Sequence, residues 1–348
     1  MDINELARRS GVSAATVSRA LNDRPEVSPA TRQRILALAG QLGYAPNASA
    51  RALASRRSGL VGLLWDTDYR SEGQQHPFLQ DLLVGLKHAL SERGQGLLLL
   101  PITGTPDPSG YVRLAQQYNL DGVVLMGVDQ HTAQVAALLD SPLPCVALDL
   151  TVRGPRSVSI GSDNRAGAAG AVRHLYGLGH RRIATITGPR DMWPAAERLT
   201  GYQEQLTRLG LPHRPDYVQA GDFFPDSGAT AMRRLLALPE PPTAVFVGGD
   251  AMAIAAIQAA ERDGRSVPGD IAVVGFDNIE AAELVRPALT TIAQDYRQFG
   301  ATAVGALVDL TVPGSPVPDP VLLPTQLVVR RSCGSDLPPA HEHATVRA

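Results

Sequence analysis

The hydrophobic pattern of residues 1–45 predicts three short helices. The segments with apolar side chains at helical spacing are residues 3–10, 14–21 and 29–42. Asp2, Ser13 and Ser28 precede them as candidate N-caps, because their side-chain oxygens can accept from the first free N–H groups. Gly11 and Gly43 follow the first and third segments, where glycine commonly ends a helix. We therefore expect a small three-helix bundle.

The second of these segments has the composition of a helix that reads DNA. Its apolar face would consist of Val17, Ala20 and Leu21, and its opposite face of Ala14, Ala15, Ser18 and Arg19. Small residues and one arginine near the N-terminal end of a helix fit a DNA major groove. An amphipathic helix capped by chance has the same local pattern, so both interpretations stay open at this point.

The next segment, residues 46–58, is rich in alanine and arginine. Asn47 could cap a short helix there, but a helix of that length is marginal alone in water. It would form only on a surface or against a copy of itself. Leu53 is its one large apolar side chain. The segment is therefore either a linker or a hinge helix that inserts Leu53 into a minor groove.

From Leu60 onward, short apolar runs alternate with helical patterns. The strand-like runs are residues 61–65, 97–100, 122–126, 146–148, 183–186, 245–247 and 271–274, and helical patterns include 78–93, 164–178, 195–209 and 252–263. Uninterrupted apolar strands separated by helices indicate parallel sheets covered on both faces. There are more such units than one sheet comfortably holds. We expect two doubly wound α/β lobes with a cleft between them.

Polar residues gather where these predicted strands end, the edge at which such lobes bind ligands. Carboxylates, an arginine and aromatic rings suit a polyhydroxylated ligand, because charged groups bind hydroxyls and a ring covers an apolar sugar face. The candidates are Trp65, Asp66, Asp149, Trp193, Arg198, Phe223, Asp250 and Asp277. Helix capping is the alternative role for Asp163, Asp250 and Asp277.

Charge and composition narrow the class of protein. The chain of 348 residues has a net charge of −2, but residues 1–60 carry +5 and the remainder −7, so the N-terminal part is suited to a polyanion. With 44% hydrophobic residues, no apolar run long enough for a membrane span and no signal peptide, we expect a globular cytoplasmic protein. Cys145 and Cys333 are the only cysteines and read as buried thiols.

Catalytic and metal motifs are missing from the sequence. There is no Gly-x-Ser-x-Gly elbow, no phosphate loop and no Gly-x-Gly-x-x-Gly after a strand. We predict neither catalytic residues nor a metal or cofactor, which disfavours a sugar- or nucleotide-modifying enzyme. Residues 60–331 alone would also fit a solute-binding protein for transport. The basic N-terminal part and the missing signal peptide argue against that alternative.

Motifs along residues 3–331 resemble the lac repressor/galactose repressor (LacI/GalR) family of transcription regulators. They are Gly11-Val12-Ser13-x-x-Thr16-Val17-Ser18-Arg19, Gly43-Tyr44-x-Pro46-Asn47-x-x-Ala50-Arg51-x-Leu53, Pro77-Phe78, Leu120-Asp121-Gly122, Leu178-Gly179-His180-Arg181-Arg182-Ile183, Gly221-Asp222-Phe223 and Val274-Gly275-Phe276-Asp277. The resemblance implies a repressor that binds a palindromic double-stranded DNA operator as a homodimer. It also implies a periplasmic-binding-protein-like body that holds a small-molecule effector.

The resemblance assigns roles to individual residues. In the DNA-binding part, Ala14, Ala15 and Arg19 match base-reading positions, Thr16, Ser18, Ser28 and Thr31 match phosphate contacts or caps, and Asn47, Arg51 and Leu53 lie in the hinge motif. In the body, Arg198 and Asp277 match the principal ligand-contacting pair, Phe223 an aromatic that stacks on the ligand, Asp149 a polar contact, and Phe78 completes the predicted effector site.

Three departures from the family bear on the effector. Gly249 and His76 stand where the family commonly has asparagine, and Met192-Trp193-Pro194 replaces the arginine and threonine of purine-binding relatives. The last departure favours a sugar or glycoside. The expected domains are a helix-turn-helix at 1–45, a hinge at 46–58, an effector-binding and dimerisation domain at 59–332 and a disordered tail at 333–348. No heptad repeat follows Arg331, so we expect a dimer without a tetramerising coil.

Overall fold

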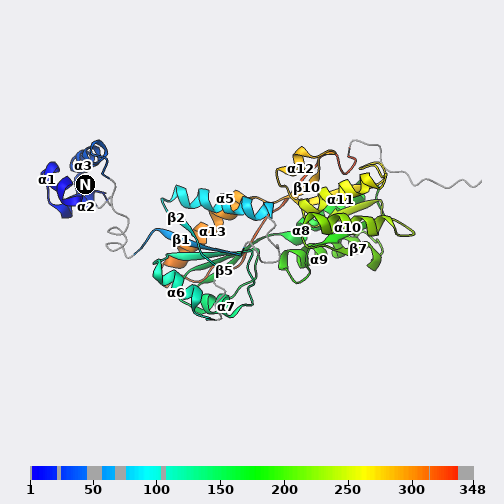
Figure 1. Cartoon of the computed structure of the whole chain (residues 1–348), viewed down its shortest axis with the longest axis horizontal. Helices are drawn as coiled ribbons and strands as arrows, with labels where there is room; N and C mark the ends of the chain where they lie inside the picture. Colours follow the sequence, from blue (N-terminus) through cyan, green and yellow to red (C-terminus); the bar gives the residue numbers. More distant parts are fainter. Residues whose placement is uncertain are drawn as a thin grey trace, which may run out of the picture. The chain divides into compact units, whose positions relative to one another are not determined.

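The computed structural model describes residues 2–21, 25–44, 57–66, 76–102, 107–312 and 314–335. The chain forms two compact units, Met1–Gly59 and Leu60–Ala348 (Figure 1). We call the first unit the head and the second the body. Most of the predicted hinge, residues 46–56, lies outside the described residues.

The head consists of the three helices that its sequence predicts, α1 (Ile3–Ser10), α2 (Ala14–Leu21) and α3 (Pro29–Gln41). The three predicted caps are in place. Asp2 accepts from the N–H of Glu5 at 2.9 Å, Ser13 from Thr16 at 3.2 Å and Ser28 from Thr31 at 3.3 Å. The small core is built on Leu6, Val17 and Ile35, one fully buried residue from each helix.

The body contains two six-stranded sheets. In spatial order, the first sheet is β11 (Val321–Leu323), β5 (Ser157–Ser162), β4 (Cys145–Leu148), β3 (Gly122–Met126), β1 (Leu60–Trp65) and β2 (Gly96–Leu99). The second is β12 (Gln326–Val328), β10 (Thr290–Ala293), β9 (Ala272–Asp277), β8 (Ala244–Val247), β6 (Ile183–Thr187) and β7 (Val218–Ala220). Among the described strands, β12 alone pairs antiparallel, with β10. The predicted pair of doubly wound lobes is confirmed.

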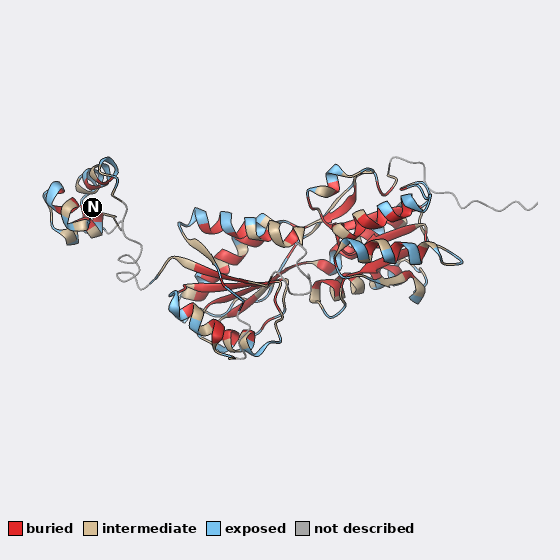
Figure 2. Cartoon of the chain, viewed as in Figure 1, coloured by how far each residue is buried: buried red, intermediate tan, exposed pale blue. Residues whose placement is uncertain are grey.

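Helices cover both faces of each sheet, and the buried residues of Figure 2 lie along the strands and the inner sides of these helices. In the first lobe they are α5 (Pro77–Glu92) and α13 (Tyr296–Thr311) on one face, and α6 (Gly110–Gln117) and α7 (Ala133–Asp140) on the other. In the second lobe they are α8 (Asn164–Gly177) and α9 (Trp193–Arg208), opposite α10 (Pro225–Leu236) and α11 (Asp250–Arg262). The short helix α12 (Ala281–Leu284) follows β9.

The chain passes between the lobes three times, from β5 to α8, from β10 to α13 and from β11 to β12. We call these segments the crossovers. Each lobe is therefore assembled from distant parts of the sequence. Ile254, on α11 of the second lobe, packs against the cores of both lobes.

The predicted disordered tail begins at residue 333, but residues 333–335 belong to the described, folded part of the chain. Cys333 is 1% exposed, and the Thr290 hydroxyl donates to its sulfur at 3.1 Å. Ser332 Oγ accepts from the Thr290 N–H at 2.9 Å and donates to the Val273 carbonyl at 2.7 Å, so this segment joins β10 to β9. The folded chain extends to Ser335 for this reason, and the rest of the predicted tail lies outside the described residues. Cys333 and Cys145 are both free and buried, as predicted.

Candidate functional site

A cavity of about 290 Å³ lies between the two lobes of the body, and we call it the interlobe cavity. The first lobe contributes His76, Phe78, Leu79, Gly127, Val128, Asp129, Gln130, His131, Leu148, Asp149 and Leu150, and the second contributes Asp191, Met192, Trp193, Pro194, Arg198, Phe223 and Asp277. Its walls are largely apolar with a few charged groups, the usual composition of a small-molecule site.

Six of the predicted effector residues line this cavity: Phe78, Asp149, Trp193, Arg198, Phe223 and Asp277. Trp65, Asp66 and Asp250 do not. The Trp65 ring instead packs with the core of the first lobe. Asp250 is fully buried, and its two oxygens accept from the Thr291 hydroxyl at 2.6 Å and the Ile279 N–H at 3.0 Å. Asp250 therefore holds the loop after β9 and does not reach the cavity.

Arg198 is the central charge of the cavity, although its residue is only 5% exposed. Its Nε donates to Asn164 Oδ1 at 2.7 Å, and its Nη1 donates to the Gly248 carbonyl at 2.5 Å. Nη1 also lies 3.5 Å from Asp277 Oδ1, and the guanidinium sits 3.7 Å above the Phe276 ring. These contacts fix the guanidinium plane before any ligand binds, which lowers the entropy cost of recognition.

Two carboxyl groups of the cavity are strongly desolvated. Burial raises the pKa of Asp149 to about 6, although the positive charge of Arg198 opposes the shift. Burial also raises the pKa of Asp277, again against Arg198. Within the described residues, Asp149 Oδ1 is buried and has no hydrogen-bond partner. A buried acceptor without a partner is costly, so this atom is suited to a donor on a bound ligand.

His76 brings a second unpaired polar atom to the cavity. Its Nδ1 is buried and lacks a hydrogen-bond partner among the described residues. Burial, together with a smaller effect of the positive charge of Arg198, lowers the pKa of His76 to about 4, so the imidazole is neutral near pH 7. The ring contacts Phe223 and Phe224 edge-on, at centroid distances of 5.8 and 6.0 Å. His76 thus joins the start of α5 in the first lobe to the second lobe.

The backbone is strained at three residues that line the cavity. Asp149, Phe223 and Asp277 have φ angles of 53°, 76° and 117°, a region that side-chain-bearing residues rarely adopt. Such strain persists where the surrounding fold imposes it, and it is concentrated at functional sites. Two glycines make room for the rings of the site. A Cβ on Gly188 would collide with the Phe223 ring, and one on Gly161 would lie 2.5 Å from Trp193.

The second candidate site is in the head, on the solvent-facing side of α2. Ala15 and Arg19 are exposed, whereas Ala14 is half-buried and packs against the head core. Thr16 shares a hydrogen bond with Ser13 at 2.9 Å, and the Ser28 hydroxyl donates to Thr31 Oγ1 at 2.9 Å. The predicted hinge residues Asn47, Arg51 and Leu53 lie outside the described residues.

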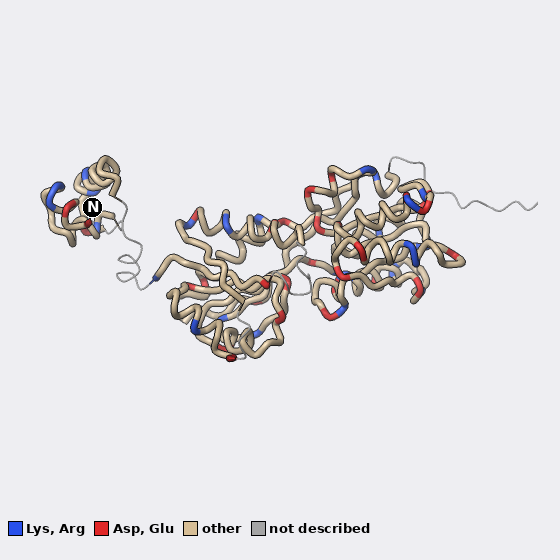
Figure 3. The backbone as a smooth tube through the Cα atoms, viewed as in Figure 1, with Lys and Arg blue, Asp and Glu red and all other residues tan. Residues whose placement is uncertain are grey.

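Part of the positive charge of the head is neutralised by an acidic residue of the same helix (Figure 3). Glu5 on α1 binds Arg8 at 2.6 Å and Arg9 at 2.7 Å, and these arginines lower the pKa of Glu5 to about 2. Both pairs are largely exposed and add little stability. Arg19 carries its charge on α2, on the face that the sequence predicts to meet DNA.

Comparison with known proteins identifies the family. Residues 2–47 match the model for bacterial regulatory proteins of the lacI family, and residues 172–333 match a periplasmic binding protein-like domain. The HTH-type transcriptional regulator CelR of Thermobifida fusca is 37% identical over 336 residues, which cover 94% of this chain and 96% of that protein. This chain belongs to the LacI family of bacterial regulatory proteins. It is a transcription regulator, and the family resemblance drawn from the motifs is confirmed.

Solved structures of LacI-family proteins match the same length of chain. The structure titled as a complex of the transcriptional regulator CelR with cellobiose has a TM-score of 0.70 and 34% identity, covering 95% of this chain and 99% of that one. The lac repressor dimer bound to operator and the anti-inducer ONPF has a TM-score of 0.77 and 30% identity, covering 96% and 99%. The ribose operon repressor of Escherichia coli K12 is 35% identical over 308 residues, covering 88% of this chain and 92% of that protein.

Gly249, where the family commonly has asparagine, lies against two residues that line the interlobe cavity. A Cβ built there would be 3.3 Å from the Phe223 ring and 3.6 Å from Asp277 Oδ2. The Phe223 ring therefore occupies space that a larger side chain at 249 would claim.

The sequence missed several apolar members of the lining, including Leu79, Val128 and Leu150. Nothing in their local pattern separates them from ordinary core residues.

Across the part of the chain that the structure describes, no helix is long and apolar enough to cross a bilayer. The described His, Cys, Asp and Glu side chains also form no group that could hold a metal ion.

The desolvated carboxyl of Asp149 predicts a pH-dependent stability. A folded-state pKa raised from 3.8 to about 6 gives stability that is present below pH 3.8 and lost as the pH rises through 6. Asp149→Asn removes the buried charge but leaves an unpaired amide, so we expect a gain on the order of 1–2 kcal/mol at pH 8. The gain should shrink at pH 5. Urea unfolding at both pH values measures it, and a gain that grows at pH 5 would contradict the assignment.

Proposed function

We propose that this protein is a cytoplasmic transcription repressor that binds a palindromic operator as a homodimer. A neutral saccharide is the proposed effector, and its binding raises or lowers the affinity for the operator. The observation that carries the proposal is the combination, in one LacI-family chain, of a helix-turn-helix head and an interlobe cavity with unpaired acceptors around a fixed arginine. We assign no catalytic role to the cavity, and the characterised relatives named above are regulators.

The DNA-binding half of the proposal rests on the head. Arg19 and Ala15 project from α2 into solvent, and the N-terminal end of α2 is the part that enters the major groove in helix-turn-helix proteins. Arg19 would bind a guanine with two parallel hydrogen bonds, and Ala15 would contact a thymine methyl. Ala14 contributes less, because the head core already covers part of it. Asn47, Arg51 and Leu53 remain proposed DNA contacts of the hinge, with Leu53 inserted into the minor groove.

The effector half rests on the polar atoms of the interlobe cavity. Asp149 Oδ1 requires a donor, which a sugar hydroxyl supplies, and His76 Nδ1 can take part in the same hydrogen-bond network. Arg198 is already opposite Asp277, so an anionic ligand would meet Asp149 without a free counter-charge. The rings of Trp193 and Phe223 offer flat apolar surface for a sugar face. A neutral mono- or disaccharide satisfies all of these groups.

Cellobiose is the natural first probe, because the relative CelR has been solved in complex with it. Since the cavity is lined by both lobes, a sugar that contacts both favours one lobe arrangement over the other. If that lobe arrangement also changes the distance between the two heads or the conformation of their hinges, sugar binding changes operator affinity. Operator binding then changes the affinity for the sugar by the same factor.

The test is a titration of full-length protein against palindromic DNA with a central C-G step, with and without cellobiose. We expect binding that weakens steeply with salt, and a change in operator affinity of about tenfold or more with saturating sugar. In parallel, cellobiose at 100 times its Kd should stabilise the fold by about 2.7 kcal/mol. Absence of specific DNA binding contradicts the repressor assignment. Specific binding with no response to any neutral mono- or disaccharide contradicts the effector assignment alone.

A further inference from the structure

Two charged groups of the interlobe cavity, Arg198 and Asp277, are hydrogen-bonded to residues at the crossovers. Gln294, directly after β10, donates to Asp277 Oδ1 at 2.7 Å. Asn164, where the chain enters α8, accepts from Arg198 Nε at 2.7 Å. Arg198 and Asp277 are therefore bonded to the segments that connect the two lobes.

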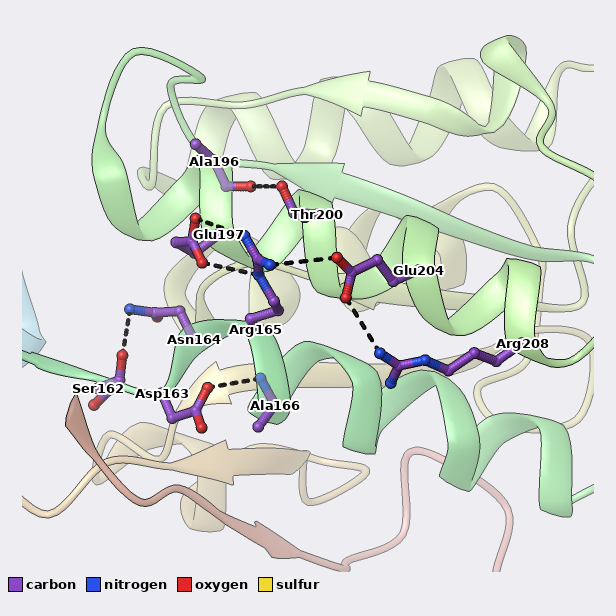
Figure 4. Close-up of polar contacts among 10 residues, drawn as sticks. All are labelled: Ser162, Asp163, Asn164, Arg165, Ala166, Ala196, Glu197, Thr200, Glu204 and Arg208. Atoms are coloured by element: carbon purple, nitrogen blue, oxygen red, sulfur yellow. Dashed lines mark hydrogen bonds and ion pairs between the residues drawn. The ribbon is translucent and has the colours of Figure 1, made fainter.

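Asn164 makes the most closely defined of these contacts. It is 1% exposed, and both ends of its amide are used. Its Nδ2 donates to the Ser162 carbonyl at 3.1 Å (Figure 4). Its Oδ1 accepts from Arg198 Nε at 2.7 Å. The first bond fixes which way the amide faces, and the second uses that orientation to hold the guanidinium. Asn164 does not belong to the described lining of the cavity, so it reaches a ligand only through Arg198.

We propose that Asn164 is a positioning residue of the effector site, which locks the Arg198 guanidinium to the β5–α8 crossover and thereby ties sugar binding to lobe orientation. This inference rests on the proposed function. A rotation of the lobes changes the path of the crossover at Ser162, and the Asn164 amide passes that change to the only guanidinium in the described cavity lining. The sugar consequently binds best to the lobe arrangement in which this chain of bonds is intact.

The neighbouring residue, Arg165, provides a matched control. It joins the same two helices, α8 and α9, through ion pairs with Glu197 at 3.0 Å and Glu204 at 3.3 Å (Figure 4). Glu204 also pairs with Arg208 at 3.5 Å. This network lies on the outer surface, where Arg165 is 47% exposed, and exposed pairs contribute little. Arg165→Ala therefore weakens the exposed contacts between α8 and α9 and leaves the hydrogen bond between Asn164 and Arg198 intact.

The experiment compares Asn164→Ala with Arg165→Ala in the full-length protein, with cellobiose as the probe. Asn164→Ala leaves the buried Nε–H of Arg198 without its acceptor, and a hydrogen bond to a charged group of this kind corresponds to about a 10- to 100-fold change in affinity. We therefore expect Asn164→Ala to lower the affinity for cellobiose by about 10- to 100-fold. This fold-change should be at least ten times larger than any change in operator affinity measured without sugar. General destabilisation would lower both together. Arg165→Ala should match the wild type in both measurements.

Two results overturn the inference. One is an Asn164→Ala protein that binds cellobiose as the wild type does while Arg198→Met does not. If the wild type itself fails to bind cellobiose, the proposed sugar is wrong. The inference about Asn164 is then tested without sugar, by measuring urea unfolding of Asn164→Ala, Arg198→Met and the double variant. Shifts in the urea midpoint that are clearly non-additive support the lock, and additive shifts overturn it.

Discussion

Replacing Arg198 by methionine is expected to lower the affinity for cellobiose by at least about 100-fold, the largest effect of any substitution in the interlobe cavity. Methionine keeps much of the side-chain length but removes the hydrogen bonds to Asn164 and Gly248. It also leaves Asp277 and Asp149 without the positive charge between them, and breaking a buried ion pair typically costs about 3–5 kcal/mol. The carboxyl groups should then take up protons near neutral pH and bind sugar hydroxyls less well.

Isothermal titration with cellobiose and operator binding with and without the sugar measure this effect. Arg165→Ala is the control, because it removes an equal charge from the neighbouring helix without reaching the cavity. The expected phenotype is a protein that still recognises operator and no longer responds to sugar. Cellobiose affinity within threefold of the wild type would show that Arg198 serves the fold of the second lobe and not its ligand.

The strands that the sequence predicts are those whose burial coincides with apolar composition. β5 shows why others escape. Its residues alternate serine with valine, isoleucine and glycine, yet the strand lies inside the first sheet. One of these serines is paired with a nearby loop, since Ser159 Oγ accepts from the Val152 N–H at 2.9 Å. The serines interrupt the apolar run, so a search for apolar segments does not find this strand.

β10 escapes for a related reason. Two fully buried threonines begin it, and Thr291 is satisfied by Asp250, 41 residues away. Edge strands β7, β11 and β12 have three residues each, too few for a period to register. Their assignment depends on which neighbour the chain returns to, which is a property of the topology.

The candidate site divides along the same line. Asp149, Arg198, Phe223 and Asp277 were predictable because each follows a predicted strand or lies in a family motif. Asp250 shares that position and still faces away, because Thr291 and Ile279 take both of its oxygens. Local sequence thus predicts which residues stand at the strand ends. Hydrogen-bond partners from distant parts of the sequence, such as Thr291 for Asp250, determine which of these residues face the cavity.

In the head, Arg19→Ala is expected to lower operator affinity by about 1–3 kcal/mol for each half-site, roughly 5- to 150-fold. Arg19 is exposed on α2, and its guanidinium can offer two parallel donors to O6 and N7 of a guanine. Ala15 can contribute only apolar contact, so α2 has no second side chain of comparable discriminating power. The variant should also lose preference for guanine at one position of each half-site, which binding to a set of single-substituted operators measures.

Arg9→Ala is the matched control for that experiment. Arg9 is an exposed arginine of the head, on α1, and Glu5 binds it at 2.7 Å. Its removal takes away the same charge, so any loss should be uniform across operator sequences and appear mainly in the salt dependence. The two variants thus separate charge from base recognition. If Arg19→Ala weakens all operators equally, as Arg9→Ala should, then Arg19 binds phosphate, and sequence choice must come from DNA deformation at the hinge.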